Sequence, residues 1–400
     1  MDMNNYGRFA KEIRGFDDLE MGYFKEIMDR GKLSIFFNEG SMVERFQKAF
    51  AAYTGAKTAL ARCNGMLALC EAVAVSGAGV GTEVLCDPVV HFGAMASLYM
   101  NAVPRFVDIE PGTYNMDPAS LRANITPNAR AVIVTHLWGL PARMDEIRDI
   151  CREHKLFLIE DCAHAVGARW KGRHVGTFGD MGMFSFQEFK QLSTGDGAMV
   201  TVNNATLADK MENEWAFSGE SPVIMALNWR MNEMTAAVGL AQLQRVDNIV
   251  KNYYNVTLKI FNDAIRDCPW LKMRVIPKEA TQAGYWFACT WEGDKHGMDY
   301  ARFKKLNEEL GIGLRFGFNE TAPYEFEFFR DAKAYGSHAC PNKCPFYTAK
   351  SNYAYKKGLC PTVEDIMPRL VTVNLIFLPI EEAKQKAELL RKAIRMMEKG

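Results

Sequence analysis

Between about residues 57 and 202, short apolar runs alternate with longer segments whose apolar residues recur every three to four positions. The short runs predict strands, and they read KTALA, TEVLCD, VPRFVDI, RAVIVT, KLFLIED, MGMFSF and AMVTV. Segments with helical spacing lie between them, for example MLALCEAVAVSG and ARMDEIRDICREH. This alternation is typical of an α/β fold in which helices cover a mostly parallel sheet.

The pattern changes after residue 230. A long helical region is predicted from Asn232 to Ile265, and Asp267-Cys268-Pro269 ends it. Mixed strand and helix patterns follow, and they read GYWFACTWEG, YARFKKLNEEL, GIGLRFG and EEAKQKAELLRKAIRMMEK. We therefore predict an N-terminal segment over residues 1–40, a large α/β domain over 41–265 and a smaller α+β domain over 266–400.

Composition and charge narrow the class of protein. The 400 residues are 48% hydrophobic, enough for a large buried core, and 48 basic residues balance 48 acidic ones. This balance gives no sign of a nucleic-acid or membrane-surface partner. The chain has no apolar run of about 18 residues, and its first residues, MDMNNYGRFAKEIRG, contain no apolar h-region. We expect a cytoplasmic globular protein.

The ten cysteines are scattered, without the dense spacing of a disulfide scaffold, so reduced thiols are expected. His338, Cys340 and Cys344 in HACPNKC resemble the start of a zinc site, but a fourth ligand at finger-like spacing is missing. No metal is therefore expected. No G-x-G-x-x-G follows a predicted strand, which argues against a nicotinamide cofactor.

Open α/β sheets bind ligands beyond the carboxyl ends of their strands, so polar residues there are site candidates. Asn64-Gly65-Met66 follows KTALA and opens a helix, which makes it either an anion site or an ordinary helix cap. Glu160 and Asp161 end an apolar strand, with His164 three residues beyond Asp161. A carboxylate in this place is either a cap or a buried functional acid.

Two further features lie later in the chain. Ser185 ends a predicted strand and Lys190 follows it, close to the turn residues 195–197. A β-hairpin with a solvated turn lysine would have the same pattern. Asn228 and Arg230 precede the long helical region, where they are either anion ligands or part of a solvated loop.

Taken in order, these features match the needs of pyridoxal phosphate. A helix start holds its phosphate, a buried carboxylate keeps its pyridine nitrogen protonated, and a lysine some thirty residues further on forms the imine. The stretch FLIEDCAHAVGARWKGRHVGTFGDMGMFSFQEFKQLSTGDGAMVTVNN resembles the active-site signature of the pyridoxal-phosphate-dependent sugar and cyclitol aminotransferases of the DegT and DnrJ type. GTEVLCDP and NWRMNEMTAAVGLAQLQRVD resemble this family too, so the resemblance covers roughly residues 40 to 250.

The resemblance implies a fold-type I aminotransferase architecture and a role for each candidate. Lys190 would be the Schiff-base lysine, and Asp161 would be the partner of the pyridine nitrogen. His164 would touch the ring or its 3-hydroxyl, and Ser185 would bind phosphate beside the Gly65-Met66 helix start. In addition, Asn228 would reach the phosphate of the neighbouring subunit of a homodimer, with Arg230 close by.

Two departures from the family pattern matter. The family usually has Ser-Gly-Thr where this chain has Asn64-Gly65-Met66, so a phosphate-binding hydroxyl is missing. In DPVVHFGAMA the spacing is one residue off, which leaves His91 or Phe92 to stack on the cofactor. Phe92 is favoured because an aromatic face covers the ring without introducing a titrating group.

A lysine at position 190, where related dehydratases carry histidine, implies transamination from an amino-acid donor such as glutamate or glutamine to a keto-sugar or ketocyclitol. The alternatives are a dehydrating, aromatising enzyme of the aminohydroxybenzoate synthase type and a non-catalytic regulator that binds pyridoxal phosphate. The acceptor stays open. Six aromatics of the carboxyl-terminal part are either pocket or core residues, and they are Tyr324, Phe326, Phe328, Phe329, Phe346 and Tyr347.

Overall fold

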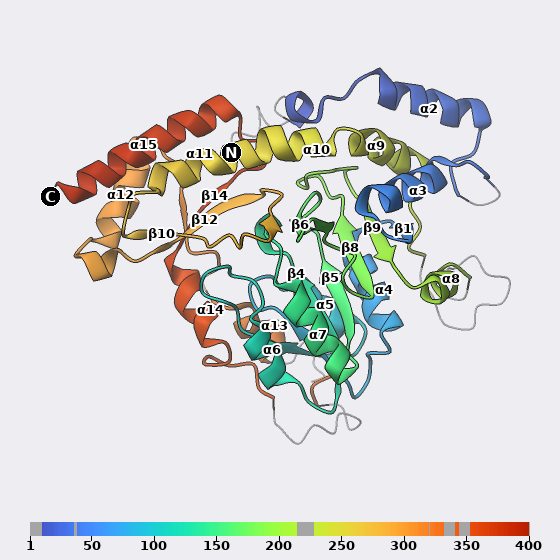
Figure 1. Cartoon of the computed structure of the whole chain (residues 1–400), viewed down its shortest axis with the longest axis horizontal. Helices are drawn as coiled ribbons and strands as arrows, with labels where there is room; N and C mark the ends of the chain where they lie inside the picture. Colours follow the sequence, from blue (N-terminus) through green and yellow to red (C-terminus); the bar gives the residue numbers. More distant parts are fainter. Residues whose placement is uncertain are drawn as a thin grey trace.

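The largest element of the fold is a seven-stranded sheet (Figure 1). The computed structural model describes residues 10–35, 38–213, 228–319, 321–331, 341–343 and 353–399. The strands are β1 (Thr58–Arg62), β2 (Glu83–Cys86), β3 (Val103–Phe106), β4 (Ala129–Thr135), β5 (Phe157–Asp161), β8 (Met181–Ser185) and β9 (Ala198–Val202). Their order is β1-β9-β8-β5-β4-β2-β3, and β9 alone within this sheet pairs antiparallel with its neighbours.

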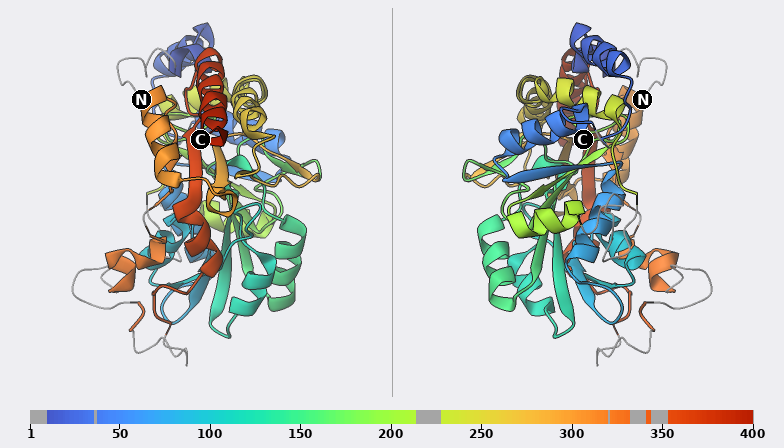
Figure 2. Two further views of the ribbon diagram at one scale, coloured as in Figure 1. Left: turned by 90° about the vertical axis from the view of Figure 1, so that its left-hand side faces the viewer. Right: turned by 90° about the vertical axis from the view of Figure 1, so that its right-hand side faces the viewer.

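Helices cover both faces of this sheet (Figure 2). Because alternate strand residues point to opposite faces, Ile133 and Ile159 pack with α4 (Gly65–Val75) and α5 (Phe92–Tyr99). Their neighbours Val132 and Leu158 pack on the other face. The helices on that face are α3 (Met42–Thr54), α6 (Pro118–Asn124), α7 (Met144–His154) and α9 (Glu233–Leu243). The strands are therefore buried from both sides, as their apolar runs predict.

A second, antiparallel sheet is built from the carboxyl-terminal part of the chain, in the order β10-β12-β14-β13. Its strands are β10 (Leu271–Met273), β12 (Trp286–Trp291), β13 (Arg315–Phe316) and β14 (Leu370–Asn374). Helices α12 (Tyr300–Leu310) and α15 (Ile380–Glu398) contribute to its hydrophobic core. The predicted architecture, a large and mostly parallel α/β sheet with a smaller α+β part, is confirmed.

The predicted long helical region is helical but interrupted. It consists of α9, α10 (Val246–Ile249), a π-helical turn (Val250–Tyr254) and α11 (Asn255–Ile265). Together they cross the top of the molecule in Figure 1, and α11 lies beside α15. Phe261 and Ile265 belong to the core of the second sheet. That core therefore begins within the helical region, before residue 266.

The remaining elements are short or peripheral. The helices are α2 (Asp18–Arg30), α8 (Ala205–Asn213), α13 (Glu327–Arg330) and α14 (Pro361–Ile366). Strands β6 (Arg169–Trp170), β7 (Arg173–His174) and β11 (Ala280–Thr281) form a three-stranded sheet in the order β11-β6-β7. No helix of the described ranges is long and apolar enough to cross a membrane.

The carboxyl-terminal aromatics pack largely against the end of β3. Tyr324 and Phe329 are fully buried and contact the ring of Phe106, at 5.3 and 5.4 Å between centroids. The backbone N–H of Phe106 donates to the hydroxyl of Tyr353 at 2.7 Å. Tyr324 and Phe329 are therefore core residues, which agrees with the core alternative of the sequence analysis. Phe326 and Phe328 are partly buried against the same core, while Phe346, Tyr347 and the cluster of His338, Cys340 and Cys344 lie outside the described residues.

Candidate active site

A cavity of about 310 Å³ lies beyond the carboxyl ends of β5 and β8, beside the start of α4. Seven of the predicted residues line it, and they are Asn64, Gly65, Met66, Phe92, Asp161, Ser185 and Lys190. Strands β5 and β8 are parallel neighbours, which brings their last residues, Asp161 and Ser185, to the same edge of the sheet. The sheet topology therefore gathers residues that are far apart in the sequence.

The start of α4 forms one wall of this cavity. The Asn64 side chain caps the helix by accepting from Leu67 N at 2.9 Å. Within the described chain, the N–H groups of Gly65 and Met66 donate to no acceptor, so they are available at the positive end of the helix dipole. A Cβ at Gly65 would lie 3.0 Å from Ser185 Cβ and 3.2 Å from its Oγ. The cap and a potential anion site therefore coexist here.

Asp161 provides the acidic wall. It is 2% exposed and its Oδ1 accepts from Ala163 N at 3.0 Å. Burial raises its pKa, while the nearby Lys190 amine acts in the opposite direction. No cation lies at ion-pair distance from it in the part of the chain that the structure describes. A positively charged hydrogen-bond donor in the cavity would therefore satisfy this carboxylate.

Glu160, the residue before Asp161, has a structural role instead. It accepts from the N–H groups of Gly176, Phe178 and Gly179 at 2.7 to 2.8 Å and so holds the loop that leads into β8. It also lies 3.1 Å from His136 Nε2. Glu160, His136 and Cys162 are close enough together to hold a metal ion, but these four contacts already occupy the carboxylate. The loop that it holds leads to Ser185.

Lys190 projects into the cavity from the loop after β8. Its Nζ donates to the hydroxyl of Tyr285 at 3.4 Å and lies 5.1 Å from the centre of that ring. Burial lowers its pKa to about 8, and the negative charge of Asp161 partly opposes this shift. Roughly a tenth of the amine is therefore neutral, and so nucleophilic, at pH 7, far more than for a solvated lysine. The β8–β9 hairpin is real as well, with Gly195 at a φ of +85°.

His164 is not part of the cavity wall. Its ring stacks on Tyr285, with centroids 4.4 Å apart and an interplanar angle of 16°. Burial and the nearby cations Lys190 and Arg274 hold its pKa well below the usual range, so the imidazole is neutral. His164 thus contacts the lysine through Tyr285, and its predicted contact with a cofactor ring stays a prediction.

His91 and Phe92 differ in their surroundings. Phe92 begins α5, is 45% exposed and lines the cavity. The His91 ring packs against Phe92 at 4.8 Å and against Phe326 at 5.7 Å, and it does not line the cavity. The geometry therefore favours Phe92 for stacking, as does the sequence argument.

Asn228 and Arg230 lie outside the cavity wall. Asn228 is exposed, and its Oδ1 accepts from Arg230 N at 3.4 Å. The residue between them in the sequence is Trp229, whose backbone oxygen accepts from Cys63 N at 2.7 Å. The backbone of Arg230 forms an isolated antiparallel β-bridge with that of Arg62. This segment therefore runs along the end of β1, directly before the helix start that contains Asn64.

Sequence reasoning missed two residues near Asp161 and Lys190. Tyr285 directly precedes β12 of the second sheet, in the stretch GYWFACT, where apolar patterning predicts only a strand. Asp87 follows β2 and is 6% exposed; burial raises its pKa to about 6, although a hydrogen bond from Thr135 opposes the shift. The position of Asp87 at a strand end was a usable signal, whereas nothing in the sequence links Tyr285 to Lys190.

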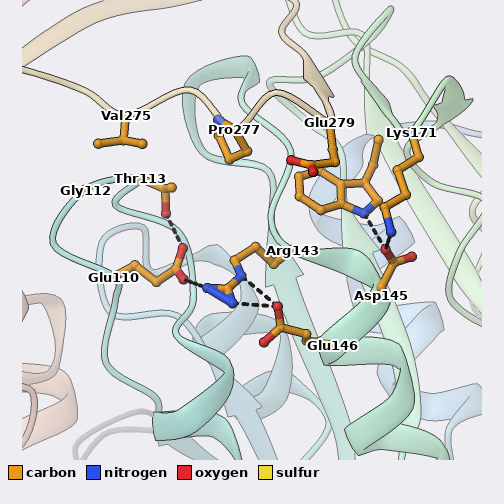
Figure 3. Close-up of a pocket in the computed structure, with 11 residues that line it drawn as sticks. Glu110, Gly112, Thr113, Arg143, Asp145, Glu146, Lys171, Val275, Pro277 and Glu279 are labelled. Atoms are coloured by element: carbon orange, nitrogen blue, oxygen red, sulfur yellow. Dashed lines mark hydrogen bonds and ion pairs between the residues drawn. The ribbon is translucent and has the colours of Figure 1, made fainter.

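A second hollow, of about 540 Å³, lies between the start of α7 and the segment that leads to β11 (Figure 3). Its charged side chains already have partners. Arg143 contacts Glu110 at 2.9 Å and Glu146 at 2.5 Å, and Lys171 contacts Asp145 at 2.5 Å. None of the predicted site residues lines it. Although larger, it offers no unpaired charged side chain among the described residues that line it.

The chain is similar to known proteins over most of its length. Residues 16–366 match the model of the DegT/DnrJ/EryC1/StrS aminotransferase family. A GDP-perosamine synthase of Caulobacter vibrioides is 39% identical over 252 residues, which is 61% of this chain and 67% of that protein. An L-glutamine:2-deoxy-scyllo-inosose aminotransferase of Streptoalloteichus tenebrarius is 39% identical over 227 residues, 52% of this chain and 53% of that protein.

Solved structures show the same arrangement of elements. The crystal structure of a 3-amino-5-hydroxybenzoic acid synthase superposes with a TM-score of 0.79, at 26% identity, over 95% of this chain and 97% of that chain. The likeness therefore includes both sheets.

Proposed function

The chain belongs to the DegT/DnrJ/EryC1/StrS aminotransferase family, and on that premise we propose that it moves an amino group from glutamate or glutamine to a keto-sugar or ketocyclitol, with pyridoxal phosphate as cofactor. Membership confirms the resemblance seen in the sequence and makes the chain an aminotransferase. The observation that carries the proposal is one cavity that holds a partly neutral lysine, a buried carboxylate that forms no ion pair with the described residues and a free helix start.

The residues present fit pyridoxal phosphate. The free N–H groups of Gly65 and Met66 and the hydroxyl of Ser185 converge where a phosphate would bind, and the absence of a Cβ at Gly65 leaves room there. Asp161 is placed to accept from a protonated ring nitrogen, because its carboxylate is buried and has no cation in contact. Phe92 offers an aromatic face. The cavity thus provides a counterpart for each polar part of the cofactor.

The roles of the protein groups follow from their chemistry. When bound, the cofactor supplies an electron sink for the electrons left when an α-proton is removed. Lys190 is the amine that would hold it covalently, and its Nζ, once released, is the base that takes and returns that proton. Tyr285 positions Nζ through its hydroxyl, and the Asp161 carboxylate keeps a proton on the ring nitrogen. The neutral imidazole of His164 adds no charge that would compete with these groups.

The acceptor class is supported by the relatives, whose names specify GDP-perosamine and 2-deoxy-scyllo-inosose chemistry. The test is a half-reaction screen. Amino acids are offered to the purified holoenzyme while the visible band of the cofactor is followed, and candidate ketones are then offered to restore it. We expect glutamate or glutamine to bleach the band, and a keto-sugar or ketocyclitol to restore it. A protein whose band no amino acid changes would contradict the proposal.

One alternative enzyme class has a specific observation in its favour, the structural likeness to a 3-amino-5-hydroxybenzoic acid synthase. Such an enzyme would form an aromatic product, which absorbs in the near ultraviolet, and an aminotransferase acting on a sugar would not. Product spectra from the same screen separate the two. Family membership favours either enzyme over a non-catalytic regulator.

The proposed homodimer has active sites shared between subunits. The helix start lacks a hydroxyl at Met66, so two N–H groups and Ser185 are few donors for a phosphate dianion. Asn228, exposed and outside its own cavity, and the guanidinium of Arg230 would supply donors to the neighbour.

Complementation between two inactive variants tests the shared sites. A chain with Lys190→Ala is mixed with a chain altered at both Asn228 and Arg230, each inactive alone. We expect activity to return once subunits exchange, because one site per mixed dimer is intact. Exchange without activity, or an active monomer, would rule out shared sites.

A further inference from the structure

Arg274 carries a charge without an acidic partner. It follows β10, and its guanidinium lies over the rings of Tyr114 and Trp138, at 5.4 and 5.6 Å from their centres. Its Nε donates to Thr113 O at 2.7 Å, but its Nη2 is buried with no hydrogen-bond partner in the described chain. No carboxylate of the described residues pairs with it. One edge of this guanidinium is therefore unsatisfied.

An unsatisfied buried charge is costly, and the aromatic contacts offset only part of that cost. Burial lowers the pKa of Arg274 to about 9, so the side chain is still charged at neutral pH. Arg143, in the hollow of Figure 3, shows the usual alternative, since two carboxylates pair with it. A carboxylate from outside the chain would complete the environment of Arg274.

The surroundings of Arg274 connect it to the Lys190 cavity. Trp138 stacks on Trp286, with centroids 6.1 Å apart and an interplanar angle of 11°, and Trp286 follows Tyr285, the partner of Lys190. Arg274 and Lys190 both act on the pKa of His164, which lies against Tyr285. The unsatisfied guanidinium and the reactive amine are therefore both close enough to His164 to act on its charge, and the stacked indoles of Trp138 and Trp286 run from Arg274 to the residue after Tyr285.

The backbone conformation of Trp138 also suits a binding site beside Arg274. Trp138 is a buried non-glycine residue with a φ of 51°, in the left-handed region. Such a conformation is strained for a residue with a side chain, and buried cases of it cluster at functional sites. Its effect here is to place the indole between Arg274 and Trp286.

We propose that Arg274 binds a carboxylate of the amino-acid donor and so selects the donor of the first half-reaction. The inference rests on the proposed aminotransferase function. A single guanidinium edge between two aromatic rings matches one carboxylate. A nucleoside diphosphate carries more negative charge than one guanidinium can balance, and the other guanidinium at this stack of rings, that of Arg315, lies over Trp286 at 5.5 Å rather than over Tyr114 or Trp138.

The experiment compares Arg274→Gln, Arg274→Lys and the matched control Arg143→Gln in the holoenzyme. Two quantities are measured, the donor concentration that gives half the maximal rate of the first half-reaction, and the rise in Tm caused by glutarate, a dicarboxylate without an amine. For Arg274→Gln we expect that concentration to rise about 10- to 100-fold, which corresponds to roughly 1.4 to 2.7 kcal/mol. The glutarate effect should disappear, and the second half-reaction with ketone should stay within about twofold of wild type.

Arg274→Lys should keep a reduced glutarate effect because it keeps the charge, and Arg143→Gln should resemble wild type. The proposal would be overturned if Arg274→Gln reached half its maximal rate at the same donor concentration as wild type. It would also be overturned if the substitution weakened only the ketone half-reaction or only inhibition by an added nucleoside diphosphate. If Arg274→Gln does not fold, the proposal requires that glutarate raise the Tm of Arg274→Lys by less than it raises the Tm of wild type. Absence of a glutarate effect in wild type would also overturn it. Failure of the proposed aminotransferase function is distinguishable, because then no amino acid bleaches the band even if glutarate binds.

Discussion

The hollow of Figure 3 and the Lys190 cavity differ in the state of their charged groups as well as in their size. The larger, of about 540 Å³, has its arginine and its lysine paired with carboxylates at 2.5 to 2.9 Å (Figure 3). The smaller, of about 310 Å³, holds Lys190 and Asp161 with pKa values displaced by burial, and neither is in an ion pair among the described residues. By volume alone the larger hollow would be chosen as the active site, whereas the unpaired charged groups identify the smaller one.

The physical reason lies in the cost of each arrangement. Exposed ion pairs contribute about 0 to 1 kcal/mol, so the residues of the larger hollow stabilise the fold weakly and leave no group available for a ligand. A buried lysine and a buried carboxylate out of contact are costly, and such an arrangement persists where a ligand supplies the missing partners. Matched substitutions in the two hollows test this contrast.

The largest difference is expected between the two lysines. Lys190→Ala should lower kcat by at least about 10²- to 10⁴-fold, because the base that moves the proton is removed. Lys171→Ala, the counterpart in the larger hollow, should stay within about twofold, because its amine pairs only with Asp145. Steady-state kinetics of both variants provides the measurement. Equal losses in the two variants would mean that the hollows do not differ in function.

The carboxylates give the next largest contrast. Asp161→Asn should keep bound cofactor but lose about 10²- to 10³-fold in kcat, on the scale of a removed electrostatic partner. Asp145→Asn should leave kcat nearly unchanged, since that carboxylate accepts only from Trp170 and Lys171. Cofactor content is read from the visible spectrum and kcat from product formation. Near-normal turnover in Asp161→Asn would mean that this carboxylate only accepts the hydrogen bond from Ala163 N and has no role in catalysis.

The pH dependence of cofactor loading gives a smaller effect. Only the neutral amine attacks the carbonyl, and burial lowers the pKa of Lys190 to about 8, so loading of the cofactor-free protein should rise with pH with a midpoint near 8. For a solvated lysine the rise would continue to about pH 10.4. Removal of the negative charge in Asp161→Asn should move the midpoint lower, because Asp161 raises this pKa. A midpoint near 10 in wild type would contradict the account.

The smallest effect concerns stability. Arg143→Met should change the free energy of unfolding by less than about 1 kcal/mol, because its pairs with Glu110 and Glu146 are partly exposed. Urea unfolding of the variant and the wild type, with the slope checked for equality, measures it. A loss of several kcal/mol would show that the larger hollow is a structural centre after all.

Much of the large domain could be predicted from the sequence, since its strands are apolar runs that the structure reproduces, such as KLFLIED for β5. Asp161, Ser185 and Lys190 could be gathered in advance because parallel strands end at one edge. The contact of Tyr285 with Lys190 could not be predicted, because Tyr285 is brought there from the start of β12 by tertiary packing and no local pattern records it. The π-helical turn at Val250–Tyr254 was missed for a similar reason, since its apolar spacing is that of an ordinary helix.

The most direct test of the central claim is the chemical identity of the lysine that holds the cofactor. The purified holoenzyme is reduced with borohydride, digested, and its peptides are mapped by mass spectrometry. We expect a single phosphopyridoxyl label on Lys190, the lysine whose pKa burial lowers to about 8. A label on Lys171 or any other lysine, or no label in a yellow protein, would contradict the account.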